Sequence, residues 1–236
     1  MRCYLVRHAQ STNNALSSLA NRDVDPPLTD LGQRQAKLVA AHLAFGSEPQ
    51  PRQPDRDDRP GYGITRLYCS PMWRSLQTAQ PIGQALGLTP EVMIDIHEQG
   101  GLYLDHGEAG GLVGYPGKSR REILADFPDY LLPKAITDGG WWSGGCEDEA
   151  NCYDRARKVA GQLYEWAETE ERIAFVSHGA FIDVLLKTLL IQAPTDRFYF
   201  THYNTAITRL DVRPERGIFA HYSNSIAHLP AGLISA

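Results

Sequence analysis

The stretch Arg2-Cys-Tyr-Leu-Val-Arg-His-Ala-Gln-Ser-Thr-Asn-Asn14 decides the fold, because it joins a short apolar run directly to a polar turn. Cys3 to Val6 is apolar with a β-branched member, which is typical of a buried strand. Arg7 and His8 come directly after it. Ligands of parallel α/β sheets lie where the strands end at their carboxyl edge. The stretch therefore predicts a strand that ends at a binding site, with polar strand-end residues of no function as the alternative.

A second stretch, Ile173-Ala-Phe-Val-Ser-His-Gly-Ala-Phe-Ile-Asp183, repeats this design. Its apolar run is followed by Ser177, His178 and Gly179, and a helical pattern then continues to Leu190. Glycine allows close approach of the backbone, and the unpaired N–H groups at a helix start favour an anion. Two strands that both end in histidine therefore predict a phosphate pocket.

The bulk composition favours a single domain spanning residues 1–236. A chain of 236 residues with 42% hydrophobic content can bury one substantial core. The formal net charge of -5 argues against a nucleic-acid surface. The longest apolar run is interrupted by Lys187 and is too short to span a bilayer, and we find no targeting signal. We expect a cytoplasmic protein with reduced cysteines and without nucleic-acid or membrane partners.

A helix, a loop and a strand are predicted after the first turn. A polar loop over residues 21–27 leads to Thr29, which can cap a helix whose apolar residues keep helical spacing until Gly46. Residues 47–63 are rich in proline, arginine and aspartate, and we expect them to form an exposed loop insertion. Ile64 to Cys69 is predicted to be the second strand.

The next helix and strand bring further charged groups to the same edge. We expect Ser70 to cap a helix with Pro71 at its start, which places Arg74 in the first turns. An arginine at a helix start interacts unfavourably with the helix dipole, and a bound anion would offset this effect. Arg74 is therefore a candidate anion ligand, with a solvated surface arginine as the alternative. Residues 92–96 are predicted to be a third strand, with Glu98 just after its end.

Residues 99–150 lose the periodicity, and we expect them to form a lid inserted over the site. Within the lid, Ser119 to Glu122 has the pattern of a capping box that opens a short helix. Arg120 and Arg121 at this helix start could reach a substrate anion, although a solvated first turn is the plainer interpretation. Tyr103 is a further candidate for substrate specificity. An apolar helical stripe over residues 152–166 and two strands over residues 206–212 and 218–222 complete the prediction.

The polar residues that should converge suit a phosphomonoester. They are Arg7, His8, Ser11, Asn14, Arg74, Glu98, His178 and Gly179. Guanidinium groups, a histidine and an amide can bind the three terminal oxygens, and a neutral His8 could attack phosphorus to form a phosphohistidine. Glu98 would protonate the leaving alkoxide and later activate water. No phosphate-binding glycine loop of the GxxxxGK[ST] type occurs, and we expect neither cofactor nor metal.

These residues resemble the histidine phosphatase superfamily, also called phosphoglycerate mutase-like. The matching pieces run in the order of that family: Arg7-His8 with Ser11 and Asn14; Leu28-Thr29 with Gly32, Gln35 and Ala36; Ser70-Pro71 with Arg74, Gln77, Thr78 and Ala79; Glu98; Glu147 with Arg155; and Ser177-His178-Gly179. The resemblance implies a three-layer α/β sandwich with a mixed, mostly parallel six-stranded sheet. It also implies His8 as phospho-acceptor, Arg7, Arg74 and His178 as phosphate ligands, and Glu98 as proton donor.

The sequence departs from the family in two places. Ala9 replaces the usual glycine, a small change that many backbone geometries tolerate. Asn13 and Gln99-Gly100-Gly101 stand where the true mutases have tryptophan and a His-Tyr-Gly stretch, and residues 117–123 look more like the broad-specificity phosphatases of the family, which favours hydrolysis. We therefore expect a metal-independent phosphatase of a small phosphorylated metabolite. A phosphoglycerate mutase with Arg120 or Arg121 on the carboxylate, a non-catalytic phospholigand-binding module and a metal site remain as alternatives. The sequence determines neither the substrate nor the oligomeric state, for which a homodimer is one candidate.

Overall fold

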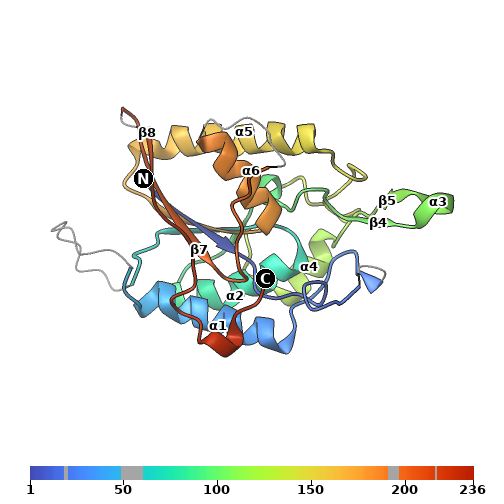
Figure 1. The fold of residues 1–236 in the computed structure, drawn as a ribbon, viewed down its shortest axis with the longest axis horizontal. Coiled ribbons are helices and arrows are strands. Elements are labelled where there is room, and N and C mark those ends of the chain that lie inside the picture. Colours follow the sequence, from blue (N-terminus) through green and yellow to red (C-terminus); the bar gives the residue numbers. More distant parts are fainter. Residues whose placement is uncertain (19–20, 49–60, 191–196, 216) are drawn as a thin grey trace.

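A mixed six-stranded sheet lies at the centre of the molecule (Figure 1). The computed structural model describes residues 1–18, 21–48, 61–190, 197–215 and 217–236. In the sheet order, the strands are β3 (Glu91–Val92), β2 (Arg66–Cys69), β6 (Arg172–Ser177), β1 (Arg2–Arg7), β7 (Ile207–Arg213) and β8 (Gly217–Ser225). The pairs from β3 to β1 are parallel, and β7 and β8 are added antiparallel. This arrangement confirms the predicted mainly parallel sheet.

Two helix layers cover the faces of the sheet. In Figure 1, α1 (Asp30–Phe45) and α2 (Trp73–Leu86) lie below it, whereas α5 (Glu149–Glu165) and α6 (Gly179–Leu189) lie above. Helices α1 and α2 pack together, as do α5 and α6. The chain is therefore a three-layer α/β sandwich, as predicted.

Successive side chains of β1 and β6 point alternately into two separate hydrophobic cores. Tyr4 and Val6 are buried in a cluster with residues of α1 and α2, whereas Cys3 and Leu5 are buried in a cluster with residues of α5 and α6. β6 divides its side chains in the same way. Successive side chains of a strand point to opposite faces, so a central strand between two helix layers is apolar at every position. This explains why the first strand reads as a continuous apolar run.

The strand register brings the two histidine stretches to one level. Arg7 of β1 pairs with Ser177 of β6, so His8 and His178 both come directly after the last paired residues. Cys69 of β2 pairs with Val176, which places Ser70 beside Ser177. The backbone N–H of His8 donates to the carbonyl of Ser177 at 2.8 Å. Parallel pairing without offset therefore gathers these residues at the carboxyl edge.

Helix α1 begins where the sequence predicts, whereas α2 does not. The Thr29 side chain accepts the N–H of Gly32, and α1 ends before Gly46. Helix α2 begins at Trp73 with Met72 as its cap residue. The predicted cap, Ser70, instead accepts the N–H of Met72 at 3.2 Å and contacts His178. Its hydroxyl therefore closes a local turn before the helix, a common competing use of serine.

The predicted third strand over residues 92–96 is mostly wrong. Only Glu91–Val92 forms β3, and the 3-10 helix η2 (Ile94–Ile96) comes after it. β3 pairs with β2 on one side and has only an isolated bridge with Leu131 on the other. The Ser177 hydroxyl donates to the carbonyl of Ile96 at 2.8 Å, which holds the end of η2 against β6. This departure leads directly to Glu98.

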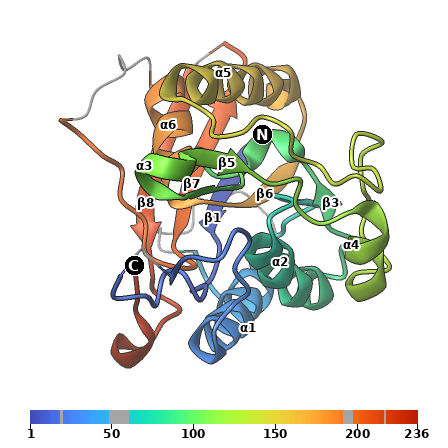
Figure 2. The same cartoon turned by 90° about the vertical axis from the view of Figure 1, so that its right-hand side faces the viewer.

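Residues 99–150 have more regular structure than predicted. β4 (Tyr103–Asp105) and β5 (Leu112–Gly114) form an antiparallel hairpin with the short α3 (Gly107–Gly110) at its tip. Figure 2 shows this hairpin in front of the sheet, between the two helix layers. The predicted capping box is confirmed at α4 (Arg120–Asp126). The strands are too short to give a periodic signal.

The remaining predictions of local structure are largely confirmed. The stripe over residues 152–166 belongs to α5 and the 3-10 helix η3 (Trp166–Glu168), and the last two predicted strands are β7 and β8. A last 3-10 helix, η4 (Ala231–Leu233), comes after β8. The four cysteines are free thiols. Most of the predicted loop over residues 47–63 lies outside the described residues. Within the described chain, no helix has the length and apolar character needed to cross a membrane.

Two glycine substitutions should change stability in opposite directions. A Cβ at Gly32 would lie 2.1 Å from the backbone oxygen of Gln10, so Gly32→Ala must displace the turn after His8. We expect it to lower the free energy of unfolding by about 1–3 kcal/mol. Gly161 lies in α5 with nothing within 4 Å of its Cβ position, so Gly161→Ala should raise that free energy by about 0.5–1 kcal/mol. Urea unfolding measures both, and a neutral Gly32→Ala would contradict the close contact.

Candidate active site

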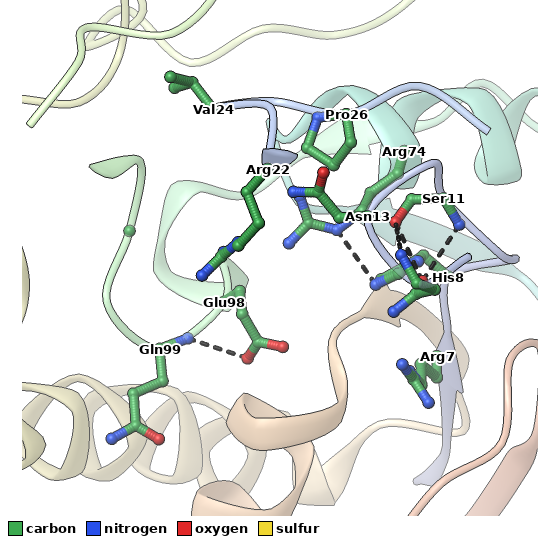
Figure 3. A pocket seen from close by; sticks show the side chains of 12 residues that line it. Arg7, His8, Ser11, Asn13, Arg22, Val24, Pro26, Arg74, Glu98 and Gln99 are labelled. Atoms are coloured by element: carbon green, nitrogen blue, oxygen red, sulfur yellow. Dashed lines mark hydrogen bonds between the residues drawn. The ribbon is translucent and has the colours of Figure 1, made fainter. Parts of the chain in front are cut away.

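One pocket at the carboxyl edge collects most of the predicted polar residues. Figure 3 shows it, and its volume is about 140 Å³. The pocket is lined by Arg7, His8, Ser11, Asn13, Asn14, Arg22, Val24, Pro26, Arg74, Glu98, Gln99 and Gly101. The volume is below the roughly 300–1,000 Å³ of sites for drug-sized ligands, so the pocket suits a small ligand.

His8 is held as a neutral imidazole with one nitrogen directed at Arg74. Its Nδ1 lies 2.7 Å from the carbonyl oxygen of Ala9, which can only accept, so Nδ1 is the donor. Nε2 then has the lone pair, and it accepts the Nε–H of Arg74 at 3.1 Å. Burial, followed by the charges of Arg74 and Arg7, lowers the pKa of His8 well below its ordinary value. The ring therefore presents an unprotonated nitrogen near neutral pH.

Residues from the end of the chain fix the backbone of His8. The Nδ2 of Asn204 donates to the carbonyl of His8 at 3.1 Å, and the N–H of Thr205 donates to the carbonyl of Arg7 at 3.1 Å. Thr205 has a positive φ of 61°, an unfavourable conformation for a β-branched residue. Local strain of this kind persists only where surrounding contacts hold it. Here it turns the Thr205 amide toward the end of β1.

His178 lies next to His8 and is completely buried. The centroids of the two rings are 5.0 Å apart, and the Nε2 of His178 lies 2.8 Å from the hydroxyl of Ser70. Its Nδ1 is buried and has no hydrogen-bond partner among the described residues. Burial is the main cause that lowers the pKa of His178 well below its ordinary value. An unsatisfied buried nitrogen is costly, and a bound ligand would relieve this cost.

Arg7 approaches the same space from the end of β1. One Nη donates to the carbonyl of His202, whereas the buried Nε has no hydrogen-bond partner among the described residues. A Cβ at Gly179 would lie 3.4 Å from this Nε, so the start of α6 borders the guanidinium. Burial lowers the pKa of Arg7, which the negative charge of Glu98 partly opposes. The Nε of Arg7 can therefore donate to a ligand, and the Nδ1 of His178 can donate or accept according to its tautomer.

Asp25 sits behind Arg74. The Nη1 of Arg74 lies 3.9 Å from Oδ1 of Asp25, and that oxygen accepts the N–H of Trp73 at 2.8 Å. Burial raises the pKa of Asp25 to about 6, although the charge of Arg74 opposes the increase. The ion pair therefore balances part of the charge of Arg74 and restrains its side chain at the start of α2.

Glu98 is fixed to the start of α6. Its carboxyl oxygens accept the N–H groups of Phe181 at 2.9 Å, Gln99 at 2.9 Å and Ala180 at 3.4 Å. Arg155 fixes the backbone that leads to Glu98, because its Nη1 donates to the carbonyl of His97 at 2.9 Å. Glu147 accepts two hydrogen bonds from Arg155, at 2.8 and 2.6 Å. The carboxyl group thus reaches the pocket with a defined position.

The other predicted residues divide into two groups. Ser11 and Asn14 line the pocket, and Oδ1 of Asn14 accepts both the N–H and the hydroxyl of Ser11, at 3.1 and 3.0 Å. Arg120 and Arg121 are not among the residues that line it, and Arg120 donates to the carbonyl of Leu132 at 3.0 Å. Tyr103 does not line the pocket either, but its ring lies 5.7 Å from the guanidinium carbon of Arg22, which does.

Sequence reasoning missed several residues of the site. Arg22 and Asp25 belong to a loop that reads only as polar, and Asn204 lies far along the chain from His8. Of these missed residues and Ser70, only Ser70 belongs to a recognisable sequence motif. That motif predicts a helix cap, whereas Ser70 contacts His178. The described residues contain no group of three His, Cys, Asp or Glu side chains placed to hold a metal ion.

The comparisons with known proteins agree on one family. The model described as histidine phosphatase superfamily (branch 1) matches residues 3–50 and 56–225. A probable phosphoglycerate mutase GpmB of Yersinia pestis (strain Pestoides F) is 35% identical over 194 residues, which are 80% of this chain and 75% of the relative.

Two solved structures have the same fold. Phosphoserine phosphatase of Entamoeba histolytica, in complex with 3-phosphoglyceric acid, gives a TM-score of 0.58 at 21% identity, over 97% of this chain and 99% of that one. Mycobacterial glucosyl-3-phosphoglycerate phosphatase, in complex with VO3, gives a TM-score of 0.58 at 20% identity, over 95% of this chain and 99% of that one.

Asp25 should produce a pH dependence of stability. Its pKa rises from 3.8 to about 6 on folding, so the folded state holds this proton more tightly than the unfolded state. The free energy of unfolding should therefore fall by up to about 3 kcal/mol as the pH rises through this range, and then level off. Asp25→Asn should lack this component.

Chemical denaturation across the range measures the difference between the wild type and Asp25→Asn. Asp23→Asn, which alters an exposed side chain of the same loop, is the matched control and should behave like the wild type. If the free energy of unfolding changed with pH in the same way for the wild type and Asp25→Asn, the raised pKa of Asp25 would be contradicted.

Proposed function

The chain belongs to the histidine phosphatase superfamily, and we propose that it is a metal-independent phosphatase of small phosphomonoesters. The observation that carries this proposal is the neutral His8, whose Nε2 meets Arg74 in a pocket that also contains Glu98. A nucleophile, cationic phosphate ligands and a carboxyl group in one small pocket are the parts that phosphoryl transfer to histidine needs.

The phosphoryl group would bind between the two partly buried arginines, Arg7 and Arg74. A phosphomonoester carries close to two negative charges near neutral pH. Arg7 and Arg74 supply positive charge, and the unpartnered Nε of Arg7 is free to donate to an oxygen. The Nε–H of Arg74 would exchange its hydrogen-bond acceptor, from Nε2 of His8 to an oxygen of the phosphoryl group. The lone pair on Nε2 of His8 would then be free to attack. Substrate binding would thereby release the nucleophile.

The first chemical step forms a covalent phosphoenzyme. The Nε2 lone pair of His8 attacks phosphorus, the bond from phosphorus to the ester oxygen breaks, and its electron pair goes to the leaving oxygen. Glu98, which must enter this step in its protonated form, donates its proton to that oxygen, so the product leaves as a neutral alcohol. The buried guanidinium groups stabilise the charge on the equatorial oxygens in the transition state.

The second step hydrolyses the phosphohistidine. Glu98, now ionised, takes a proton from water, and the water oxygen attacks phosphorus. The phosphorus–nitrogen bond breaks, its electron pair returns to Nε2 and inorganic phosphate forms. Glu98 and Gln99 are partly exposed and Arg22 is exposed, which gives water access to this side of the pocket.

Phosphoglycerate mutase activity is the second candidate, because the Yersinia pestis relative is named as a probable mutase. The mutase would use the same phosphohistidine but return the phosphoryl group to a substrate hydroxyl. Access of water favours hydrolysis. The expected binding of a carboxylate by Arg120 or Arg121 lacks support, because neither side chain lines the pocket.

Substitution of His8 tests the nucleophile. We expect the wild type to release phosphate from p-nitrophenyl phosphate in the presence of a chelator, and His8→Ala to lower kcat by a factor of about 1,000 or more. His106→Ala, an exposed histidine of the hairpin, is the control and should keep wild-type activity. Equal rates for His8→Ala and wild type would favour a non-catalytic binding module, and loss of activity with the chelator would favour a metal enzyme.

Substitution of Glu98 tests the proton donor. Glu98→Gln should slow phosphoryl transfer from an alkyl phosphate by about 100-fold or more, because an alkoxide needs a proton to leave. The p-nitrophenolate ion leaves without one, so the single-turnover rate with p-nitrophenyl phosphate should fall much less. An equal loss with both substrates would show that Glu98 has another role.

Product analysis separates the phosphatase from the mutase. With 3-phosphoglycerate, we expect free phosphate to accumulate without the 2-phospho isomer, because water reaches the phosphoenzyme. Phosphorus NMR distinguishes the two products. Rapid formation of the isomer without phosphate release would establish the mutase instead.

A further inference from the structure

We propose that Arg22 binds a second anionic group of the substrate, carried by the alcohol portion that leaves during phosphoryl transfer. This inference rests on the proposed function and deepens it, since it assigns the specificity of the same pocket. The ligand chemistry is an anionic oxygen group, which a carboxylate or a second phosphate could supply.

Arg22 lies on the side of the pocket where the leaving group must be. Figure 3 shows its side chain directed into the pocket toward the Glu98 side, away from Arg7 and His8. In an in-line transfer, the leaving oxygen stands opposite the attacking nitrogen of His8. The proton donor and the leaving alcohol therefore share the region that Arg22 enters. The charge of Arg22 acts on the alcohol portion more directly than on the phosphoryl group.

Two contacts from different parts of the chain hold Arg22 in place. Its guanidinium carbon lies 5.7 Å from the ring centroid of Tyr103, a cation–π distance. The side chain of Asn13 holds the neighbouring Asp23 by both backbone groups: Nδ2 donates to the Asp23 carbonyl at 2.8 Å, and Oδ1 accepts the Asp23 N–H at 2.9 Å. The backbone beside Arg22 is thus clamped, and its head group rests on the hairpin.

The positive charge of Arg22 is left available for a ligand. Among the described residues, no carboxylate lies within 4.0 Å of its guanidinium group. Arg74, by contrast, faces Asp25. Burial lowers the pKa of Arg74, the charges of Asp25 and Glu98 oppose this effect, and the charge of Arg22 makes a smaller contribution that lowers the pKa further. Arg22 and Arg74 therefore repel each other weakly across the pocket. A ligand with negative charge at both ends would relieve this repulsion.

Arg22 thereby takes the role of binding a second substrate anion, which the sequence suggests for Arg120 or Arg121. Neither of those residues lines the pocket. Arg22 and the two arginines of the phosphoryl site line the same pocket of about 140 Å³, so a short alcohol portion is sufficient to join the two anionic groups. Tyr103, a predicted specificity residue, acts here through Arg22, so it is a positioning residue.

A matched substrate pair tests the proposal. The compounds 3-phosphoglycerate and glycerol 3-phosphate differ in having a carboxylate or a hydroxymethyl group at the far end. We expect the wild type to prefer 3-phosphoglycerate in kcat/KM. In Arg22→Met, which keeps an unbranched side chain without the charge, this preference should fall by about tenfold. Arg22→Lys should retain part of it.

Arg121→Met is the control variant, because it removes an exposed cation that does not line the pocket. Its preference should equal that of the wild type. Tyr103→Leu should reduce the preference partially, since the cation remains but loses its ring contact. A third substrate, 1,3-propanediol bisphosphate with its monophosphate as reference, shows whether a phosphate serves the subsite better than a carboxylate.

The possible results separate this inference from the proposed function. Hydrolysis of all substrates with the same preference in the wild type and Arg22→Met would overturn the role of Arg22 and leave the phosphatase intact. Loss of the preference in Arg121→Met instead would assign the second anion to α4 and equally overturn the proposal. Absence of phosphate release from every substrate would overturn the proposed function itself.

Discussion

Burial of positive charge at the carboxyl edge of the sheet is the constraint on which the site depends. Burial lowers the pKa of Arg7 and Arg74, because the charged form of each loses hydration. The same burial keeps His8 and His178 neutral. A phosphoryl dianion, the ligand of the proposed function, would offset the free-energy cost of these partly buried cations, so this cost would favour its binding. Neutral imidazole is also the nucleophilic form of histidine, so under the proposed function one physical cause would serve both binding and reactivity.

The fold supplies the precision that this chemistry needs, because charge stabilisation is effective only when the donors are fixed in advance. The register of β1 and β6 places His8 and His178 at one level. The positions of their side chains are then set by residues outside the strands, such as Asn204 and Ser70. Glu98 comes from a segment that has left the sheet, and the N–H groups of α6 hold its carboxyl group. The sheet and the helix layers thus each contribute residues that fix the side chains of the one pocket.

The sequence predicts the parts of the site that depend on periodicity and on the edge rule of parallel sheets. β1 and β6 are apolar along their length because both faces are covered, and the residues directly after them must lie at the carboxyl edge. The remaining parts depend on contacts between distant segments, which no local pattern encodes. Arg22 is recognisable only once the hairpin brings Tyr103 beside it. The position of Ile96 after the short β3 likewise involves a distant residue, because the hydroxyl of Ser177 donates to its carbonyl.

The depth of each cation in the pocket decides which part of catalysis it can serve. Arg7 and Arg74 are partly buried, and under the proposed function they would face the group whose charge is redistributed in the transition state, so their interactions would strengthen as the reaction proceeds. Arg22 is exposed, and in the proposed complex it would face atoms of the substrate whose charge does not change. Its interaction with them would be the same in the ground state and in the transition state, and would therefore affect KM and the choice of substrate more than kcat. The proposed roles thus assign reactivity and selectivity to opposite ends of one pocket. A substitution at Arg22 would then alter the choice of substrate, whereas one at Asp25 in the same loop would also disturb Arg74 at the phosphoryl site.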